Sequence, residues 1–452
     1  MKMKNFDFLK EAVKKASEEQ GILEYELYYS EDASISAETY RDELSEFSSS
    51  VGALLLYRCI VNGKLGYAST EDFTEEEMPK LVSRARENAA VIERDEEAVI
   101  YAGAAPEAYG KAETVPFTMP DAAEIKRVVM HDREILYRGD PMIADGTCAS
   151  AAASESTMRL YNSHGLDLSV SVGCASEVME AVLDDGNEKQ FDYDFMFDRF
   201  DAPDEEREAL VKKITAGAHG KFGAGTVKTG KYPIVFDRKQ VKAILSTFLS
   251  NFYAENVQKG MSLLKGKVGE KIAADCITIT DDPFRKGNTM QMPFDGEGVP
   301  TRKKNVVENG VLKTLLYNLT TAKKDGVETT GNASRSASSI GTRVFSFYVN
   351  PGVLSKDELI AKAGNGIYVN EMKGFHAGAN AVTGDFSIES AGFLIEDGKL
   401  TKPVKSFTVA GNFYDLLKSV SDVGSELEMS GPGVTQIASP EILVPDMSVA
   451  GD

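Results

Sequence analysis

The sequence predicts an α+β protein with a small N-terminal α/β domain, a central α+β domain and a larger, β-rich C-terminal domain. Stretches in which apolar and polar residues alternate, as in half-buried strands, are interleaved with stretches of helical spacing. Segments rich in glycine, proline and small residues interrupt this pattern near residues 96–120 and 217–230. A chain of 452 residues is also too long for one ordinary core. We therefore expect an N-terminal domain at 1–95, a linker at 96–120, a central domain at 121–225 and a C-terminal domain at 226–452.

The first domain is expected to contain a helix, a small antiparallel sheet and a second helix. The first helix has apolar residues at helical spacing, namely Phe6, Leu9, Val13 and Ala16. Alternation then predicts strands over 23–29, 33–39 and 51–61. Asn62-Gly63 suits a tight hairpin turn into a strand at 64–68. The second helix is expected over residues 78–89.

The central domain is expected to be a meander between two helices. Asp121 can cap a helix that Gly139 ends. Residues 143–200 follow a period of two, with turns at 162–165 and 184–187. A helix follows around residues 205–218.

The C-terminal domain is expected to begin with a strand at 232–236 and a helix at 239–253. Short strands and turns dominate the rest. Asp397-Gly398 predicts a hairpin, and Asn309-Gly310 lies in a similar sequence. Ser355 and Asn412 are typical N-cap residues of short helices.

Composition limits the possible functions. The 70 acidic and 50 basic residues give a net charge of −20, which argues against nucleic acid as the main partner. Four scattered cysteines without a CxxC pair fit a reducing cytoplasm. The N-terminus lacks the apolar core of a signal peptide, and the longest apolar run, 51–57, is too short to span a bilayer.

Familiar catalytic motifs are missing. The sequence contains no GxSxG, no Walker lysine loop and no strand-linked GxGxxG. No two of its four histidines lie within one helical turn, so neither HExxH nor HExxxH can form; they are His131, His164, His219 and His376. A Ser/His/Asp arrangement of Ser387, His376 and Asp385 can be drawn, but proximity in sequence does not establish a triad.

The stretch 374–412 holds the candidate binding residues. Gly384, Asp385, Phe386 and Ser387 begin a predicted strand, and His376 precedes them in the same glycine-punctuated segment. Alternation places the polar side chains on one face and the apolar ones on the other. We expect this segment to line a peptide-facing groove, which another backbone could approach at Gly384. The structural alternative is a turn in which Asp385 bonds nearby backbone N–H groups.

Two blocks of the C-terminal domain carry a family resemblance. Residues 294–335 read FDGEGVPTRKKNVVENGVLKTLLYNLTTAKKDGVETTGNASR, and residues 381–412 read AVTGDFSIESAGFLIEDGKLTKPVKSFTVAGN. Both blocks resemble the TldD/PmbA family, once described as modulators of DNA gyrase and now as peptidases. In weaker form the resemblance extends over nearly the whole chain.

The resemblance also implies what this chain lacks. TldD-like subunits carry HExxxH on a helix early in the C-terminal domain and a metal-binding cysteine near the C-terminus. Here Leu245, Ser246 and Ser250 stand by position where His, Glu and His would be, and no cysteine follows Cys276. These side chains cannot replace imidazole ligands and a general base. The chain is thus similar to the other subunit type, PmbA or TldE, which implies no catalytic residues, no bound metal and no cofactor.

The resemblance implies a cytoplasmic, non-catalytic subunit of a TldD-type metallopeptidase complex that helps bind and process unfolded or leader peptides. Its expected partners are a TldD-like zinc peptidase subunit and peptide substrates, and in isolation we expect an inactive homodimer. No membrane or nucleic-acid partner is expected. Two alternatives remain, a stand-alone peptidase without a metal and a regulatory binding protein that acts on gyrase or a toxin system.

Overall fold

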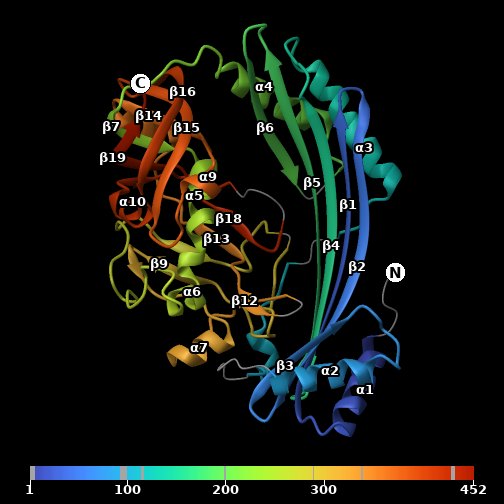
Figure 1. The fold of residues 1–452 in the computed structure, drawn as a ribbon. Coiled ribbons are helices and arrows are strands. Elements are labelled where there is room, and N and C mark those ends of the chain that lie inside the picture. The colour runs from blue at the N-terminus through green and yellow to red at the C-terminus, as the bar shows by residue number, and fades with distance from the viewer. Residues whose placement is uncertain are drawn as a thin grey trace.

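The computed structural model describes residues 6–91, 99–113, 117–197, 200–288, 290–336, 339–428 and 433–452. A long antiparallel sheet with helices on it forms one side of the molecule, and a C-terminal body of short strands and helices forms the other (Figure 1). No helix in these residues is both long enough and apolar enough to cross a membrane. The mixture of helices and sheets confirms the predicted α+β class.

The long sheet has six strands in the order β3-β2-β1-β4-β5-β6. Their bounds are β1 Glu24–Tyr40, β2 Glu43–Val61, β3 Lys64–Thr70, β4 Cys148–Asn162, β5 Asp167–Asp184 and β6 Lys189–Phe197. The strands predicted at 23–29 and 33–39 form one strand, so their separation was wrong. Ser30 between them pairs with Leu54 of β2 on one side and with Met158 of β4 on the other, and these ladders keep the chain extended.

The β1–β4 pairing also unites segments predicted to lie in different domains. Strands β1 to β3 belong to the expected N-terminal domain and β4 to β6 to the expected central domain, yet all six share one sheet. The described part of the expected linker packs on the C-terminal body: Tyr109 donates a hydrogen bond to the Gly298 carbonyl (3.1 Å), and the Glu113 amide donates to Gln291 (2.7 Å). The domain boundaries themselves stay a prediction.

One face of the long sheet carries helices at both ends. Helices α1 (Phe6–Glu19) and α2 (Met78–Val91) pack against Leu27 and Tyr29 of β1. Helices α3 (Ala122–Arg138) and α4 (Asp204–His219) pack near Ile35 and Ala37 of the same strand. These β1 residues have odd numbers and share a face, because side chains alternate along a strand. As predicted, Asp121 caps α3, where it accepts hydrogen bonds from two backbone amides.

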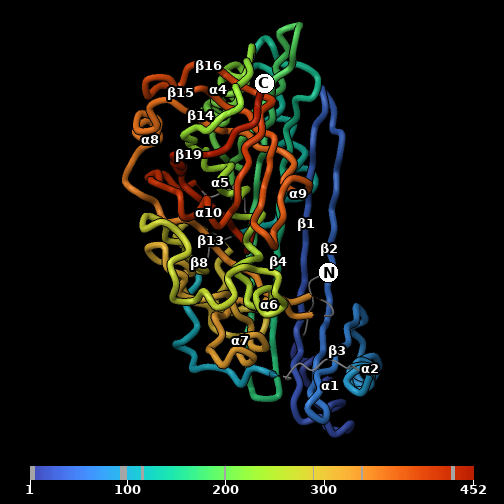
Figure 2. The backbone as a smooth tube through the Cα atoms, turned by 60° about the vertical axis from the view of Figure 1, so that its left-hand side comes forward, coloured from blue at the N-terminus to red at the C-terminus, as the bar shows by residue number. Residues whose placement is uncertain are grey.

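The opposite face of the sheet meets the C-terminal body. Val172 and Cys174 of β5 share an apolar cluster with Met290, Met292 and Phe345. In Figure 2 the yellow and orange C-terminal segments lie along strand β4. The molecule therefore has the long sheet in its middle, with helices on one side and the C-terminal body on the other.

The C-terminal body contains a closed five-stranded barrel. Its strands follow the order β16-β15-β14-β7-β19, and pairing of β16 with β19 closes it. Their bounds are β7 Gly230–Phe236, β14 Gly366–Lys373, β15 Asp385–Glu396, β16 Lys399–Asn412 and β19 Ile442–Ala450. Strand β17 (Asp422–Val423) adds to β19. Closure removes the open edges that a flat sheet of these strands would expose.

A second sheet lies below the barrel in Figure 1, in the order β10-β9-β8-β13-β18. Its strands are β8 Ile279–Asp281, β9 Lys304–Glu308, β10 Val311–Leu312, β13 Ser346–Val349 and β18 Gln436–Ala438. Strands β11 (Ala333–Arg335) and β12 (Ile340–Thr342) form a separate pair. The helices of this body are α5 Arg238–Phe248, α6 Ala254–Gln258, α7 Leu319–Asp325, α8 Lys356–Ala363, α9 Phe375–Gly378 and α10 Phe413–Ser419. A 3-10 helix, η2 (Leu249–Phe252), directly follows α5, and another, η1 (Pro106–Ala108), lies in the expected linker.

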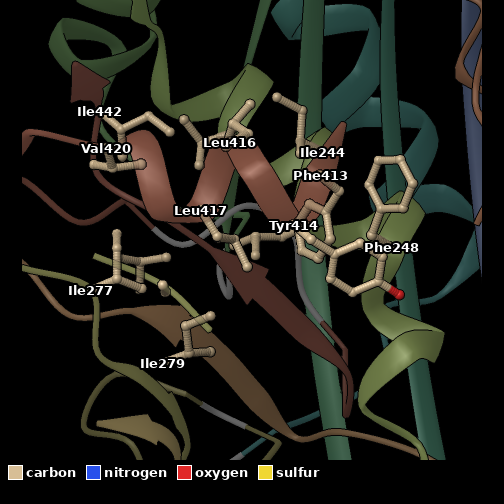
Figure 3. Packing of buried hydrophobic residues seen from close by; sticks show 14 of the residues in the cluster. Ile244, Phe248, Ile277, Ile279, Phe413, Tyr414, Leu416, Leu417, Val420 and Ile442 are labelled. Carbon is tan, nitrogen blue, oxygen red and sulfur yellow. The ribbon is translucent and has the colours of Figure 1, made fainter. Parts of the chain in front are cut away.

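The main apolar core joins the barrel, α5 and α10. In Figure 3, Phe413 and Leu416 of α10 lie beside Ile244 and Phe248 of α5, and the Phe248 and Phe413 rings stack with centroids 4.6 Å apart. Phe248 also approaches Phe386 of β15, 6.3 Å between centroids. The buried face of α5 is thus fully used in packing.

The predicted hairpins are confirmed. Asn62-Gly63, Asn309-Gly310 and Asp397-Gly398 all have positive φ at both residues, as a two-residue turn of type I′ requires. The predicted caps Ser355 and Asn412 also accept backbone amides at the starts of α8 and α10.

Candidate functional site

The predicted binding segment lies on the side of the barrel that faces the long sheet. In both Figure 1 and Figure 2, the short helix α9 stands at the edge of the C-terminal body next to the long strands. The loop after α9 leads directly into β15, which begins at Asp385. This position is compatible with an inward-facing role.

Gly384 is required by the local structure itself. Its φ is +84°, a conformation that L-residues with a side chain rarely adopt. A β-carbon there would lie 2.7 Å from a ring carbon of Tyr414 and 3.1 Å from the Asn412 amide nitrogen. The close neighbour of Gly384 is therefore the Tyr414 ring, where we had expected room for a peptide backbone.

The alternation predicted for β15 is observed. Phe386 and Ile388 are buried in the core, whereas Asp385 and Ser387 are exposed. Asp385 accepts a hydrogen bond from the Asn412 side chain (2.9 Å), which also donates to the Thr383 carbonyl (2.9 Å). The bond from Asn412, with a second from Thr383, lowers the pKa of Asp385. Because its pKa is lowered, Asp385 is anionic at neutral pH, and its side chain is exposed.

Strand β15 has a neighbouring strand on both edges between Glu389 and Ile395, and before Glu389 the edge away from β16 meets the loop after α9 through a bridge between Phe386 and Ala379. The strand pairs with β14 from Glu389 to Ile395 and with β16 from Asp385 to Glu396. A peptide cannot add to β15 as a further strand along these paired residues, because their backbone groups already bond to neighbouring strands. Outside these paired residues, the predicted binding segment offers a peptide the exposed side chains of Asp385 and Ser387, and of His376 on α9.

Helix α5 stands where the family's metal motif is expected. The polar face that it turns toward the long sheet carries no histidine. Lys239 donates to the Tyr193 carbonyl of β6 (3.2 Å), and its ammonium lies 4.8 Å from the Tyr193 ring centroid. Burial, and to a smaller extent Lys239, lowers the pKa of Lys242. Of the positions compared with the motif, Ser246 is exposed and Ser250 half-buried, but Leu245 is buried in the core. Leu245 therefore faces away from any site on this surface.

The helix also ends earlier than predicted. Helix α5 stops at Phe248, and η2 continues to Phe252 with tighter turns. Phe252 packs against Phe347 and Phe413, so this last turn is shaped by the core.

The other histidines and the cysteines are dispersed. His131 contacts Asp204 (2.8 Å), His219 contacts Asp140 (2.7 Å) and His164 lies 3.8 Å from Glu24, all in the long-sheet half of the molecule. Cys276 is exposed, and its thiol points to the Val420 carbonyl. Across the described ranges, no three His, Cys, Asp or Glu side chains are grouped as metal ligands would be.

Sequence reasoning missed a buried charged cluster between the two halves of the molecule. We call Glu26, Arg58, Glu297 and Arg335 the charged junction. Arg58 of β2 donates to Glu26 of β1 through two nitrogens (2.8 and 3.3 Å) and lies 3.5 Å from Glu297. Arg335 of β11 also bonds to Glu26. All four side chains are at most 4% exposed, so this cluster ties the long sheet to the C-terminal body in a region without solvent.

The electrostatics of the junction follow from burial and pairing. Burial raises the pKa of Glu26, but Arg335 and Arg58 together outweigh burial and lower it. Asp295, two residues before Glu297, has its pKa raised to about 7 by burial and by Glu297, against three backbone amides that stabilise its anion. The sequence offers no local signal for this junction, because Glu26 and Arg58 are more than 200 residues away from Glu297 and Arg335 along the chain.

Comparisons with known proteins agree with this architecture. A profile described as the PmbA/TldA metallopeptidase C-terminal domain matches residues 229–451, and one described as PmbA/TldA metallopeptidase domain 1 matches residues 25–89. The chain belongs to the PmbA/TldD family. The resemblance read from residues 294–335 and 381–412 is thereby confirmed.

Individual relatives support the same family over most of the chain. A protein of Methanothermobacter thermautotrophicus named metalloprotease is 29% identical over 398 residues, 86% of this chain and 85% of that protein. A metalloprotease PmbA homolog of Haemophilus influenzae is 26% identical and covers 74% of this chain and 71% of its own.

Solved structures share the fold from end to end. A Thermotoga maritima protein described as a putative modulator of a DNA gyrase has a TM-score of 0.89 at 27% identity, and covers 99% of this chain and all of its own. TldE from Thermococcus kodakarensis has a TM-score of 0.86 at 26% identity, with 98% and 100% covered.

A metallopeptidase family implies a metal, but the residues described here do not fit one. The inward face of α5 and η2 offers Lys239, Lys242, Ser246 and Ser250, and none of these is a customary zinc ligand at neutral pH. In the described ranges Cys276 does not belong to any group of three His, Cys, Asp or Glu side chains that could hold a metal. We therefore derive no metal-dependent step for this chain.

Proposed function

We propose that this chain is a non-catalytic, PmbA/TldE-like subunit of a TldD-type metallopeptidase complex and helps to bind and process unfolded or leader peptides. One observation carries the proposal. The chain keeps the fold of the family, but the inward face of its helix α5 presents lysines and serines in place of metal ligands. The likeness to TldE over 98% of the chain supports the same subunit type. The four free cysteines are consistent with a cytoplasmic complex.

In this proposal a peptide passes between the barrel and the long sheet and contacts the exposed polar residues near α9. Asp385 supplies a negative charge and Ser387 a hydroxyl, while Phe386 anchors the strand in the core. His376 lies on α9, close in sequence to the same surface. Polar side chains of this kind can bond to the main-chain N–H and C=O groups of an extended peptide, which nearly all sequences share, and this suits a processing complex with varied substrates.

Co-purification with a TldD-like subunit, followed by cleavage of an unstructured peptide, tests the proposal. Cleavage is expected only when both chains are present, and chelation of the partner's metal should abolish it. Cleavage by this chain alone that resists chelators would support the stand-alone peptidase. Tight binding to gyrase or a toxin component without any cleavage would support the regulatory protein.

The metal prediction is tested on the isolated chain. We expect less than stoichiometric zinc by elemental analysis after dialysis, because the described residues provide no ligand set. About one zinc per chain would contradict the assignment as a non-catalytic subunit.

The binding segment is tested with Ser387→Arg. Ser387 is exposed near the start of β15, where its backbone pairs with Ala410 of β16, so the longer cationic side chain should not disturb folding. Peptide cleavage by the complex should fall several-fold while co-purification is unchanged. Glu396→Arg, an exposed site at the hairpin end of the same strand, is the matched control. Equal cleavage by both variants would remove Ser387 from the peptide path.

A further inference from the structure

Strand β2 has a long unpaired edge. It runs from Glu43 to Val61, but β3 pairs only with residues 55–61 on its outer side. Among the residues that the structure describes, no strand covers the outer side of residues 43–54. Residues 45–52 are exposed along this edge, apart from their pairing with β1 on the inner side. In Figure 2 the upper part of β2 is the outermost strand of the long sheet.

The turn between β2 and β3 fixes which residues direct their backbone groups outward. Val61 and Lys64 flank the two-residue turn, so they form a hydrogen-bonded pair. In an antiparallel ladder such pairs recur at every second residue. The register between β1 and β2 runs without a shift from Ile60 to Glu46, so the alternation continues upward. The outward N–H and C=O groups in the free segment therefore belong to Phe47, Ser49, Val51 and Ala53.

This edge lacks the usual protection against pairing. Natural edge strands carry lysine, proline or inward-pointing charges that discourage a second strand. Residues 47–54 read FSSSVGAL, with no charge and no proline. Two of their apolar side chains are exposed, Phe47 at 40% and Val51 at 58%. The irregularity opposite Glu38 and Thr39 lies at the start of β2 and leaves this segment regular.

We infer that β2 pairs antiparallel with β2 of a second copy of this chain, with the two-fold axis at Ser49. Antiparallel pairing must match outward residues with outward residues, which leaves two-fold axes at Ser48, Ser49 or Ser50 near the middle of the segment. The axis at Ser49 places Phe47 opposite Val51 of the other copy, and Val51 opposite its Phe47. Pairs of an aromatic and a β-branched residue are among the favourable cross-strand pairs.

The neighbouring positions agree with the same register. Around Ser49, Glu46 falls opposite Gly52, so no two carboxylates meet across the interface. With the axis at Ser48, Phe47 would face Ser49. With the axis at Ser50, Val51 would face Ser49 and Phe47 would face Ala53, so each alternative loses the pairing of Phe47 with Val51. Phe47 and Val51 lie on the face that α3 covers, where the Lys126 ammonium is 4.3 Å from the Phe47 ring centroid. The pairing would join two six-stranded sheets into one continuous sheet and would bury both apolar side chains.

Val51→Lys tests the edge, with Val353→Lys as the control. Lysine on an edge strand opposes pairing, whereas Val353 is 89% exposed in a loop of the C-terminal body, away from this edge. Light scattering at micromolar concentration should give about twice the chain mass of 49.0 kDa for the wild type and the control, and the single mass for Val51→Lys. A monomeric wild type, or a Val51→Lys variant that remains dimeric, would overturn the inference.

Cross-linking tests the register. Ser49→Cys is made together with Cys276→Ser, because Cys276 is the exposed native thiol. A short bismaleimide should link two copies, since the two residues at the axis lie about 5.5 Å apart between Cα atoms in a hydrogen-bonded pair. Val353→Cys in the same background should give no comparable dimer band. A band of equal yield from both variants, or none from Ser49→Cys, would refute the axis at Ser49.

Discussion

The charged junction offers the sharpest test of how the two halves of the molecule are held together. Arg58 is 2% exposed and contacts Glu26 and Glu297, which are 0% and 1% exposed. Replacing Arg58 with Met keeps much of the side-chain volume but removes the guanidinium. Glu26 would keep Arg335 as a direct partner, whereas Glu297 would keep the Leu319 amide, 2.8 Å away, and the weaker attraction of Arg335.

The expected loss is large because the remaining carboxylates stay buried. Removing one member of a buried ion pair typically costs about 3–5 kcal/mol of unfolding free energy, since an uncompensated charge is left without water. We expect Arg58→Met to fall in this range, toward its lower end because Arg335 still neutralises Glu26.

The same sheet contains a matched control. Arg41 also donates to one carboxylate through two nitrogens, Nε at 3.1 Å and Nη2 at 2.7 Å from Asp145, but its side chain is 58% exposed. Exposed pairs contribute about 0–1 kcal/mol. Arg41→Met should therefore cost much less than Arg58→Met, although both changes remove a bidentate arginine–carboxylate pair.

Urea unfolding followed by circular dichroism measures both variants, and hydrogen exchange in β1 and β11 reports whether the junction opens locally. Adding Glu26→Gln to Arg58→Met should cost less than the sum of the single changes, because the two residues share one network. Equal stability losses for Arg58→Met and Arg41→Met would refute the argument from burial. So would strict additivity of the Glu26 and Arg58 changes.

Three further predictions concern separate parts of the chain. Burial and the neighbouring Asp132 raise the pKa of Glu177 to about 8. The contribution of Glu177 to the free energy of unfolding is therefore present below about pH 4, the pKa of an unfolded glutamate, and is lost as pH rises through 8. Glu177→Gln should flatten the fall in urea stability over this pH range. Ser355→Ala should lower the free energy of opening α8 by about 0.5–2 kcal/mol in hydrogen exchange, because a reciprocal cap is lost; unchanged exchange would contradict it. Gly384→Ala should cost about 1–3 kcal/mol in thermal unfolding, from the positive φ and the Tyr414 ring; a neutral result would show that this loop relaxes freely.

Local features of the fold were predictable because they depend on a few adjacent residues. Asn62-Gly63 and Asp397-Gly398 specify tight turns through the φ values that they tolerate. Asp121 identifies the start of α3 through one capping side chain. Such features need no knowledge of what packs against them.

Features that depend on distant partners were not predictable. In the sequence, the segment around Ser30 looked like a break between two strands. Only its pairing with β2 and β4 shows that both parts belong to the single strand β1. Closure of the barrel rests on three residue pairs between β16 and β19, beginning with Thr408 and Ala450. The charged junction joins Glu26 to Arg335, so their contact has no signature within any sequence window.

The candidate site shows the same division. Alternation correctly assigned Phe386 to the core and Ser387 to the surface, since it follows from strand geometry alone. The packing of Gly384 against the Tyr414 ring could not be predicted, because Tyr414 belongs to α10, which follows the whole β15–β16 hairpin. The comparison by position placed Leu245 at a metal site, but the helix turns that residue into the core.

The contacts between the two halves differ in strength at the two ends of the molecule. At one end the charged junction is shielded from water. At the other end Lys405 of the barrel reaches Glu188 at the β5–β6 turn (2.6 Å), but the side chains are 44% and 27% exposed, so salt and water weaken this pair. The buried charged contacts between the long sheet and the C-terminal body therefore lie at the junction, outside the barrel, whereas the Lys405–Glu188 pair at the barrel is accessible to water.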